Sequence, residues 1–284
     1  MREPPSDQQA LSELIPGAIE RVLNQSSIAA LATLVEAERG VGAKLLVEET
    51  GRRTGGLTDA ALDKAVARHA SLFLASREQA QTFKAEELGC MHREWRAARI
   101  LFERIAPEPR LVICGAGHVG ASLAHLARTL GYKTVLIDDR ADFLARERFP
   151  DEAIELVVAR SWSEAVREAV GLGRAVAVAV VTRGHNEDEE CMRAALGSRP
   201  DYIGLIGSKR RTNIVLDRLR EAGMDDARLR NVRAPVGLDI GAVSPAEVAL
   251  AILAEIVAER RGGTGAPLSA WRRRDKAEGR KAEG

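Results

Sequence analysis

The second half of the chain alternates short apolar runs with charged segments, and this alternation is the feature that most restricts its fold. Runs this short and this apolar are typical of strands buried on both faces, as in a parallel sheet covered by helices. We therefore expect an α/β, Rossmann-like domain from about Leu111 to about Arg261, with helices on both faces of a parallel sheet. The five expected strands are Leu111–Cys114, Thr134–Ile137, Ile154–Val158, Ala175–Val181 and Tyr202–Ile206.

The first of these strands leads into a G-x-G-x-x-G element. The element precedes a predicted helix that runs to about Leu130, and in this context it typically binds phosphate groups. Glycines allow a tight turn and close backbone approach, while the helix N-terminus offers free N–H groups and a partial positive charge. A glycine-rich turn without a ligand is the alternative. The predicted contacts to a phosphate or pyrophosphate are Gly115, Gly117, His118, Val119 and Gly120.

Two acidic residues, Asp138 and Asp139, follow the second predicted strand. In a dinucleotide site, Asp138 would accept hydrogen bonds from the ribose hydroxyls. Asp139 would repel a second phosphate, which favours NAD over NADP, whereas Arg140 works against that preference. A solvated helix cap is the alternative for both acids.

The loop after the fourth predicted strand, Thr182–Cys191, would lie at the carboxyl edge of the sheet, where such folds bind ligands. His185 is a candidate ligand contact, proton donor or metal ligand, and Asp188 lies one turn further along the same helix. Acidic residues also suit a helix N-terminus on electrostatic grounds alone. Cys191 fits a small core residue as well as it fits a functional one.

A serine and three basic residues follow the fifth predicted strand, at Ser208, Lys209, Arg210 and Arg211. Such a cluster at a helix start can bind a phosphate with help from the helix dipole, and a solvated basic face is the alternative. The chain has no phosphate-loop, H-E-x-x-H or G-x-S-x-G motif, so P-loop nucleotide hydrolysis and the commoner hydrolase reactions lose support.

Residues 1–106 indicate a smaller α+β domain. Pro16 suits the start of a helix at Ile15–Gln25, and Thr58 or Asp59 is the expected N-cap of a helix that reaches Phe73. Two apolar runs rich in Ile, Val and Leu predict strands at Ser27–Glu36 and Ala43–Val47.

Two prolines mark Ala106–Arg110 as the linker, so residues 107–263 form the Rossmann-like domain. Its last helix is predicted to begin at Ser244-Pro245, with Glu247 at capping-box spacing, and to end at Gly262-Gly263. Residues 264–284 form a basic, polar tail whose composition favours disorder over docking on a partner.

The composition excludes several classes of function. A formal charge of +1 over 284 residues predicts no general attraction to nucleic acid. The sequence lacks both a run of about 18 apolar residues and an apolar signal core, so we expect a cytoplasmic protein without membrane contact. The cysteines, Cys90, Cys114 and Cys191, are far apart, which argues against a disulfide framework or a structural zinc site.

Five segments together resemble the XdhC/CoxI family in order and spacing. The family consists of molybdenum-cofactor chaperones that serve xanthine dehydrogenase and related hydroxylases. The resemblance implies a carrier rather than a catalyst, which binds molybdopterin, assists its sulfuration and inserts it into a xanthine dehydrogenase-type or CO dehydrogenase-type hydroxylase. The segments are Cys114–Gly120, Ile137–Arg140, Thr182–Asp188, Tyr202–Lys209 and Ala234–Gly241.

The same resemblance implies partners and a candidate thiolate. The implied partners are the apo-hydroxylase, a cysteine desulfurase, a cofactor cytidylyltransferase and a second copy of the chain in a homodimer. Cys90-Met91-His92 stands where many relatives carry C-G-G, which makes Cys90 the candidate ligand to molybdenum or its sulfur source.

Two other functions fit the residues. An NAD-dependent oxidoreductase is suggested by the glycine turn with Asp138 and by His185 as a proton shuttle. A nucleotide-sensing or protein-binding module without catalysis is the third hypothesis.

Overall fold

The computed structural model describes residues 7–76, 78–90 and 92–270. The chain divides into two compact units, Met1–Glu108 and Pro109–Gly284. Among the described residues, no helix combines the length and the apolar composition needed to cross a bilayer.

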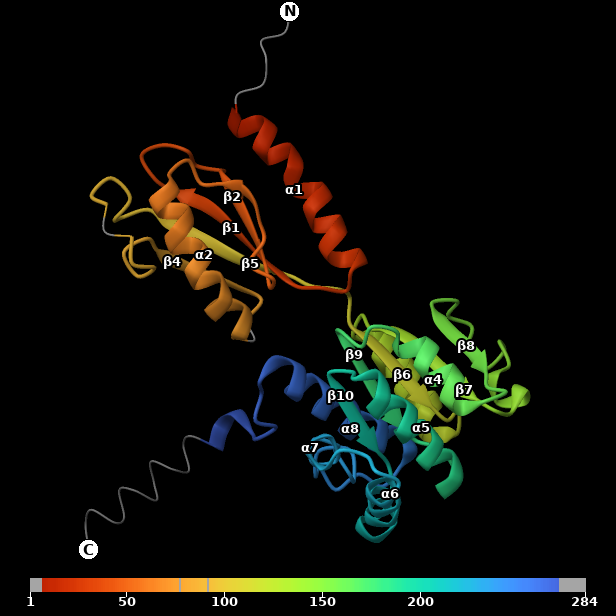
Figure 1. Ribbon diagram of the computed structural model, residues 1–284. Helices are drawn as coiled ribbons and strands as arrows, with labels where there is room; N and C mark the ends of the chain where they lie inside the picture. The colour runs from red at the N-terminus through yellow and green to blue at the C-terminus, as the bar shows by residue number, and fades with distance from the viewer. Residues whose placement is uncertain (1–6, 77, 91, 271–284) are drawn as a thin grey trace, which may run out of the picture. The chain divides into compact units, whose positions relative to one another are not determined.

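The second unit is built on a parallel five-stranded sheet, which confirms the expected α/β fold. Its strands lie in the order β10-β9-β6-β7-β8, so the first strand in the chain is central (Figure 1). The chain order therefore reverses between β6 and β9, and in such sheets ligands bind outside the carboxyl ends of the strands at this reversal. The strands are β6 (Arg110–Cys114), β7 (Lys133–Asp138), β8 (Ile154–Val158), β9 (Val176–Val180) and β10 (Tyr202–Leu205).

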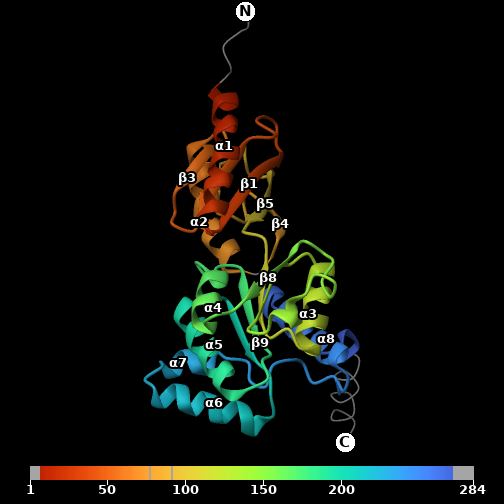
Figure 2. The same cartoon turned by 90° about the vertical axis from the view of Figure 1, so that its right-hand side faces the viewer.

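Helices cover both faces of this sheet because alternate residues of its strands point to opposite sides. In β6, Leu111 and Ile113 pack with α3 (His118–Thr129) and α8 (Pro245–Arg261). Val112 and Cys114 pack with α4 (Trp162–Val170) and α5 (His185–Ser198) on the other face (Figure 2). The remaining helices of the unit are η1 (Ala141–Leu144), α6 (Lys209–Glu221), α7 (Asp226–Arg230) and η2 (Leu268–Ala270).

The ends of α8 match the sequence-based prediction. The Ser244 hydroxyl accepts from the Glu247 amide, and the Glu247 carboxylate accepts from the Ser244 amide, which completes a capping box. Gly262 ends the helix in the left-handed conformation with φ +74°, where glycine carries no steric cost. Most of the predicted disordered tail, residues 271–284, lies outside the described residues.

The first unit contains an antiparallel sheet with strand order β3-β2-β1-β5-β4 (Figure 1, with β3 labelled in Figure 2). α2 (Ala60–Ala75) packs on one face of it, and α1 (Asp7–Asn24) packs on the other through Ile15, Ala18 and Val22. The strands are β1 (Ala29–Glu36), β2 (Lys44–Glu48), β3 (Arg53–Gly56), β4 (Ala80–Lys84) and β5 (Arg99–Ile105).

Two expectations for this unit need correction. The first helix begins at Asp7, so Pro16 lies inside it and not at its start. The sheet has five strands where the sequence suggested two. Sequence patterns did not reveal β5, because it alternates charged residues with the buried Ile100 and Phe102, or β3, because it carries two glycines. Of the two candidate N-caps of α2, Asp59 is the one that accepts hydrogen bonds from the helix amides.

Candidate functional site

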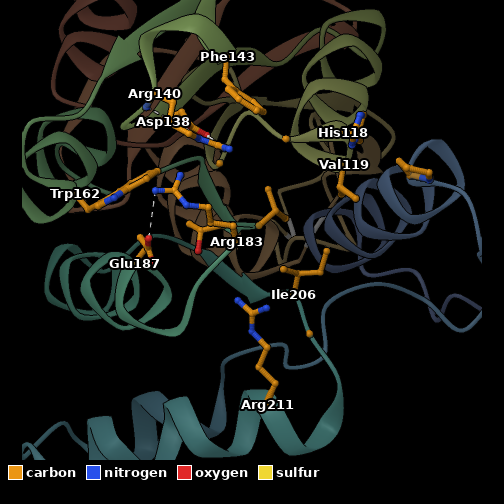
Figure 3. Close-up of a pocket in the computed structure, with 16 residues that line it drawn as sticks. His118, Val119, Asp138, Arg140, Phe143, Trp162, Arg183, Glu187, Ile206 and Arg211 are labelled. Atoms are coloured by element: carbon orange, nitrogen blue, oxygen red, sulfur yellow. Dashed lines mark hydrogen bonds and ion pairs between the residues drawn. The ribbon is translucent and has the colours of Figure 1, made fainter.

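A cavity of about 630 Å³ lies at the carboxyl edge of the parallel sheet (Figure 3). The loops that follow β6, β7, β9 and β10 all contribute to it, together with the first residues of α4 and α8. It therefore lies at the reversal of strand order, where ligand binding is expected. Its lining consists of Gly115, Gly117, His118, Val119, Asp138, Arg140, Phe143, Trp162, Val181, Thr182, Arg183, Glu187, Ile206, Gly207, Arg211 and Pro245.

Two glycines of the turn after β6 are required by close backbone packing. Gly115 has φ +113°, and a Cβ on it would lie 2.6 Å from the Val181 carbonyl oxygen. A Cβ on Gly120 would lie 1.8 Å from the Gly115 carbonyl oxygen. Neither position accepts a side chain without a backbone shift, so these glycines shape the turn before any ligand is considered.

The third glycine, Gly117, leaves space at the start of α3. It is the N-cap residue, with φ −64° and ψ −172°, and no side chain caps the helix there. A Cβ on Gly117 would have no heavy atom within 4 Å. His118 and Val119, in the first turn of α3, line the cavity. The positive end of the helix dipole therefore faces open space, an arrangement suited to an anion.

Asp138, at the end of β7, is 1% exposed, and protein groups satisfy both of its carboxylate oxygens. Oδ2 accepts from the Ala116 amide at 2.7 Å and from Arg140 Nη2 at 2.9 Å, while Oδ1 accepts from Arg140 Nε at 2.8 Å. Burial alone would raise the pKa of Asp138, but the hydrogen bonds from Arg140 and Ala116 outweigh it and hold the pKa below its ordinary value. The carboxylate thus fixes the glycine turn and Arg140.

Arg183 connects the loops on either side of the glycine turn. Its Nη1 and Nη2 atoms each lie 2.9 Å from a carboxylate oxygen of Asp139, which follows β7. Its guanidinium also lies 3.6 Å from Glu187 and extends into the middle of the cavity in Figure 3. Since β7 and β9 flank β6, this ion pair spans the end of the central strand.

Asp188 links α5 to α6 through an ion pair with Arg211. It is fully buried, accepts from the Thr182 hydroxyl at 2.5 Å, and pairs with Arg211 Nη2 at 2.5 Å. Burial raises the pKa of this carboxyl against the lowering effect of those two partners. Arg211 itself lines the cavity, so Asp188 positions a cation there without reaching the cavity surface.

Several other predicted site residues do not line the cavity. His185 begins α5 but does not line the cavity, and neither do Lys209 and Arg210 in the first turn of α6. Ser208 caps α6, since its hydroxyl accepts from the Arg211 amide at 3.2 Å. Cys90 is 3% exposed within the core of the first unit, which leaves its thiol no access to a ligand in this conformation.

Sequence reasoning missed several residues that shape the cavity. The Arg140 guanidinium lies 3.5 Å from the centroid of the Phe143 ring, and Trp162 supplies a second aromatic wall. Arg183 stands two residues after Val181, the last residue of an expected strand. Arg140 stands two residues after Asp138, the acid that follows another expected strand. The carboxyl-edge rule that selected the acids would have selected these cations had it been applied to every residue after each strand.

The sequence matches known families over both units. Residues 111–256, just over half of the chain, match the XdhC Rossmann domain, and residues 22–84 match the XdhC and CoxI family. The chain therefore belongs to the XdhC/CoxI family. This confirms the resemblance found in the five sequence segments. Four of these segments include the loops that follow β6, β7, β9 and β10 at the carboxyl edge of the sheet.

Three relatives are similar to about half of this family member. They are an uncharacterized protein, YqeB, of Escherichia coli K12 (34% identical over 55% of this chain and 28% of that protein), a probable xanthine dehydrogenase subunit of Bacillus subtilis 168 (30% over 57% and 46%), and the molybdenum cofactor insertion chaperone PaoD of Escherichia coli K12 (27% over 54% and 41%). The matched segment thus spans less than half the length of each relative.

Proposed function

We propose that this XdhC/CoxI protein binds molybdenum cofactor in the cavity of its Rossmann domain and delivers it to a molybdenum hydroxylase. One observation carries the proposal: an uncapped helix N-terminus at Gly117 opens into a cavity lined by three guanidinium groups. The similarity to PaoD, named as a molybdenum cofactor insertion chaperone, supports the same role. Membership of the XdhC/CoxI family supports the role of a carrier, and a carrier needs no catalytic residue.

The charges of the cavity suit a phosphorylated pterin. Each guanidinium of the cavity pairs with a carboxylate: Arg140 with Asp138, Arg183 with Asp139, and Arg211 with Asp188. The free α3 amides would hold the phosphate, and the guanidinium groups would add hydrogen-bond donors to it. The rings of Phe143 and Trp162 offer apolar surface for the flat pterin.

The bound cofactor would supply the redox-active molybdenum that the hydroxylase requires, and the chain would only bind, orient and release it. All three cysteines are buried. We therefore propose that a cysteine desulfurase sulfurates the cofactor while it is bound, without a relay through a thiol of this chain. The apo-hydroxylase, of xanthine dehydrogenase or CO dehydrogenase type, a cytidylyltransferase and a second copy of the chain are the proposed cytoplasmic partners.

An NAD-dependent oxidoreductase has less support. The strand order suits a nucleotide, but the acid expected to bind the ribose hydroxyls is Asp138, and both of its oxygens accept hydrogen bonds from protein donors. A ribose would have to displace Arg140 or the Ala116 amide. We expect no thermal stabilisation of the protein by NAD or NADH.

The sharpest test of the cofactor proposal is Gly117→Asp. An aspartate at this N-cap position would accept hydrogen bonds from the α3 amides, which stabilises a helix by only about 0.3 kcal/mol relative to glycine. It would also place a negative charge where the anion is expected. The variant should therefore fold at least as well as the wild type while losing the cofactor. The measurement is pterin fluorescence after oxidation of protein purified from a molybdopterin-producing host.

A matched control adds the same side chain away from the cavity. A Cβ on Gly197, near the end of α5, would have no heavy atom within 4 Å, so Gly197→Asp should leave the pterin content unchanged. Equal pterin content in the wild type and Gly117→Asp, or none in the wild type, would exclude this binding site.

A further inference from the structure

Three side chains that can bind a metal converge in the first unit, which contributes no residue to the glycine-turn cavity. Asp59 precedes α2, and His92 and Glu94 come from the loop between β4 and β5. One potential ligand atom from each lies within 4.8 Å of the other two. Among the described residues, these three form the one such group that this spacing identifies. His92 and Glu94 are exposed, so an ion could enter from solvent.

Each carboxylate of the group is held by hydrogen bonds to one of its oxygens. Asp59 Oδ1 accepts from the Ala61 and Leu62 amides at 2.8 and 3.0 Å, and Oδ2 is not used in capping α2. Glu94 Oε2 accepts from Arg39 Nη2 at 2.9 Å. These bonds restrict the positions of both side chains.

A second observation points into the same place. Trp95 is 1% exposed, and its indole Nε1 is buried without a hydrogen-bond partner among the described residues. The indole N–H faces the Asp59 carboxylate without reaching it in good hydrogen-bond geometry. It helps to lower the pKa of that carboxyl, after the Leu62 and Ala61 amides and together with the charge of His92. A buried donor without a partner usually has an unseen acceptor, such as an ordered water. Here the adjacent acceptor is the Asp59 carboxylate, and a donor beside a metal-binding carboxylate commonly orients it.

We propose that Asp59, His92 and Glu94 bind a divalent transition-metal ion, with at least one coordination position left to water. One imidazole nitrogen and two carboxylate oxygens suit Zn²⁺, which binds such atoms at about 2.0–2.2 Å. Ligand atoms on opposite sides of the ion are then about 4 Å apart at most, so small side-chain rotations would close the set. This site is independent of the cofactor cavity and of the function proposed for it.

The proposal is tested by titrating the full-length, chelator-treated protein with Zn²⁺ in a calorimeter. We expect one equivalent to bind to the wild type, with affinity reduced at least tenfold in His92→Ala and in Glu94→Gln. Glu38→Gln removes an exposed acid beside Arg39 in the sequence that is not part of the group, and it should leave the affinity unchanged. Because His92 and Glu94 are exposed, thermal unfolding of the metal-free variants should match the wild type.

Co²⁺ in place of Zn²⁺ identifies the ligand atoms. Its visible spectrum should lack the charge-transfer band that thiolate ligands produce, because all three cysteines, Cys90 near His92 included, are buried. Absence of saturable Zn²⁺ binding, equal affinity in the wild type and both ligand variants, or a thiolate band would each overturn the proposal.

Discussion

The Oδ2 atom of Asp138 accepts a hydrogen bond from the backbone amide of Ala116 at 2.7 Å. This bond ties the end of β7 to the glycine turn that follows β6. The same carboxylate holds Arg140 at the edge of the cavity. An acid that in related folds faces a ribose is therefore part of the scaffold that shapes the binding turn.

Replacing Asp138 with Asn should destabilise the protein. The amide side chain would present N–H donors to the guanidinium of Arg140, so hydrogen bonds to a buried charge would be lost at a cost of about 2–3 kcal/mol. Urea denaturation at pH 7 measures the difference. A change below about 0.5 kcal/mol would contradict the structural role.

The same substitution predicts a pH dependence. The pKa of Asp138 in the folded protein is lowered, so its stabilisation is fully present above the unfolded pKa of about 3.9 and is lost as the pH falls through the folded value. The stability difference between wild type and Asp138→Asn should be constant between about pH 6 and 8 and shrink below about pH 4. Paired urea titrations across this range provide the check, and a difference that grows on acidification would refute the assignment.

Two glycines of the same turn should respond differently to a single added methyl group. In Gly120→Ala the methyl would lie 1.8 Å from the Gly115 carbonyl oxygen, and we expect a loss of about 3 kcal/mol or more. In Gly117→Ala the methyl meets no atom within 4 Å, and we expect a loss below about 1 kcal/mol. Thermal unfolding of both variants distinguishes them, and similar melting temperatures would show that the turn is looser than described.

Much of this fold follows from the sequence because strong local patterns agree with the tertiary packing. The strand expected at Ala175–Val181 is β9, Val176–Val180, and its side chains are all buried. Ser244 and Glu247 encode the start of α8 locally. In contrast, β5 is recognised only from its pairing with β1 and β4 in the structure, because its charged residues obscure the alternation of buried and exposed positions in the sequence.

The candidate site was only partly predictable. The glycine turn combines a local motif with a known helix-end preference, so its position could be read directly. The hydrogen-bond partner of Asp138 could not be predicted from the sequence, because the choice between a ribose and the Ala116 amide depends on three-dimensional spacing. Likewise, the ion pair of Asp188 with Arg211 joins residues on different helices, and neither of the two local sequence motifs predicts it.

Arg183 should matter more for ligand binding than for stability. It is half exposed, and such ion pairs contribute about 0–1 kcal/mol, so Arg183→Gln should unfold within about 1 kcal/mol of the wild type. Removal of a cation from the cavity should weaken pterin binding about tenfold and reduce its dependence on salt concentration. Retained pterin content at several ionic strengths provides the measurement. Arg193→Gln, which removes a half-exposed arginine of α5 outside the cavity, is the control.

Glu255 of α8 links the helix to β10 and to the loop that follows it. Its Oε2 accepts from the Tyr202 hydroxyl at 2.6 Å and from the Gly237 amide at 2.9 Å. Glu255→Ala leaves both donors without this acceptor and should cost about 2–3 kcal/mol, whereas Tyr202→Phe removes one bond and should cost about 1 kcal/mol. Because both substitutions disrupt one shared bond, the double variant should be less destabilised than the sum of the two by about 1 kcal/mol. Urea denaturation of the four proteins tests this coupling, and strict additivity would show that the hydroxyl does not bind Glu255 in solution.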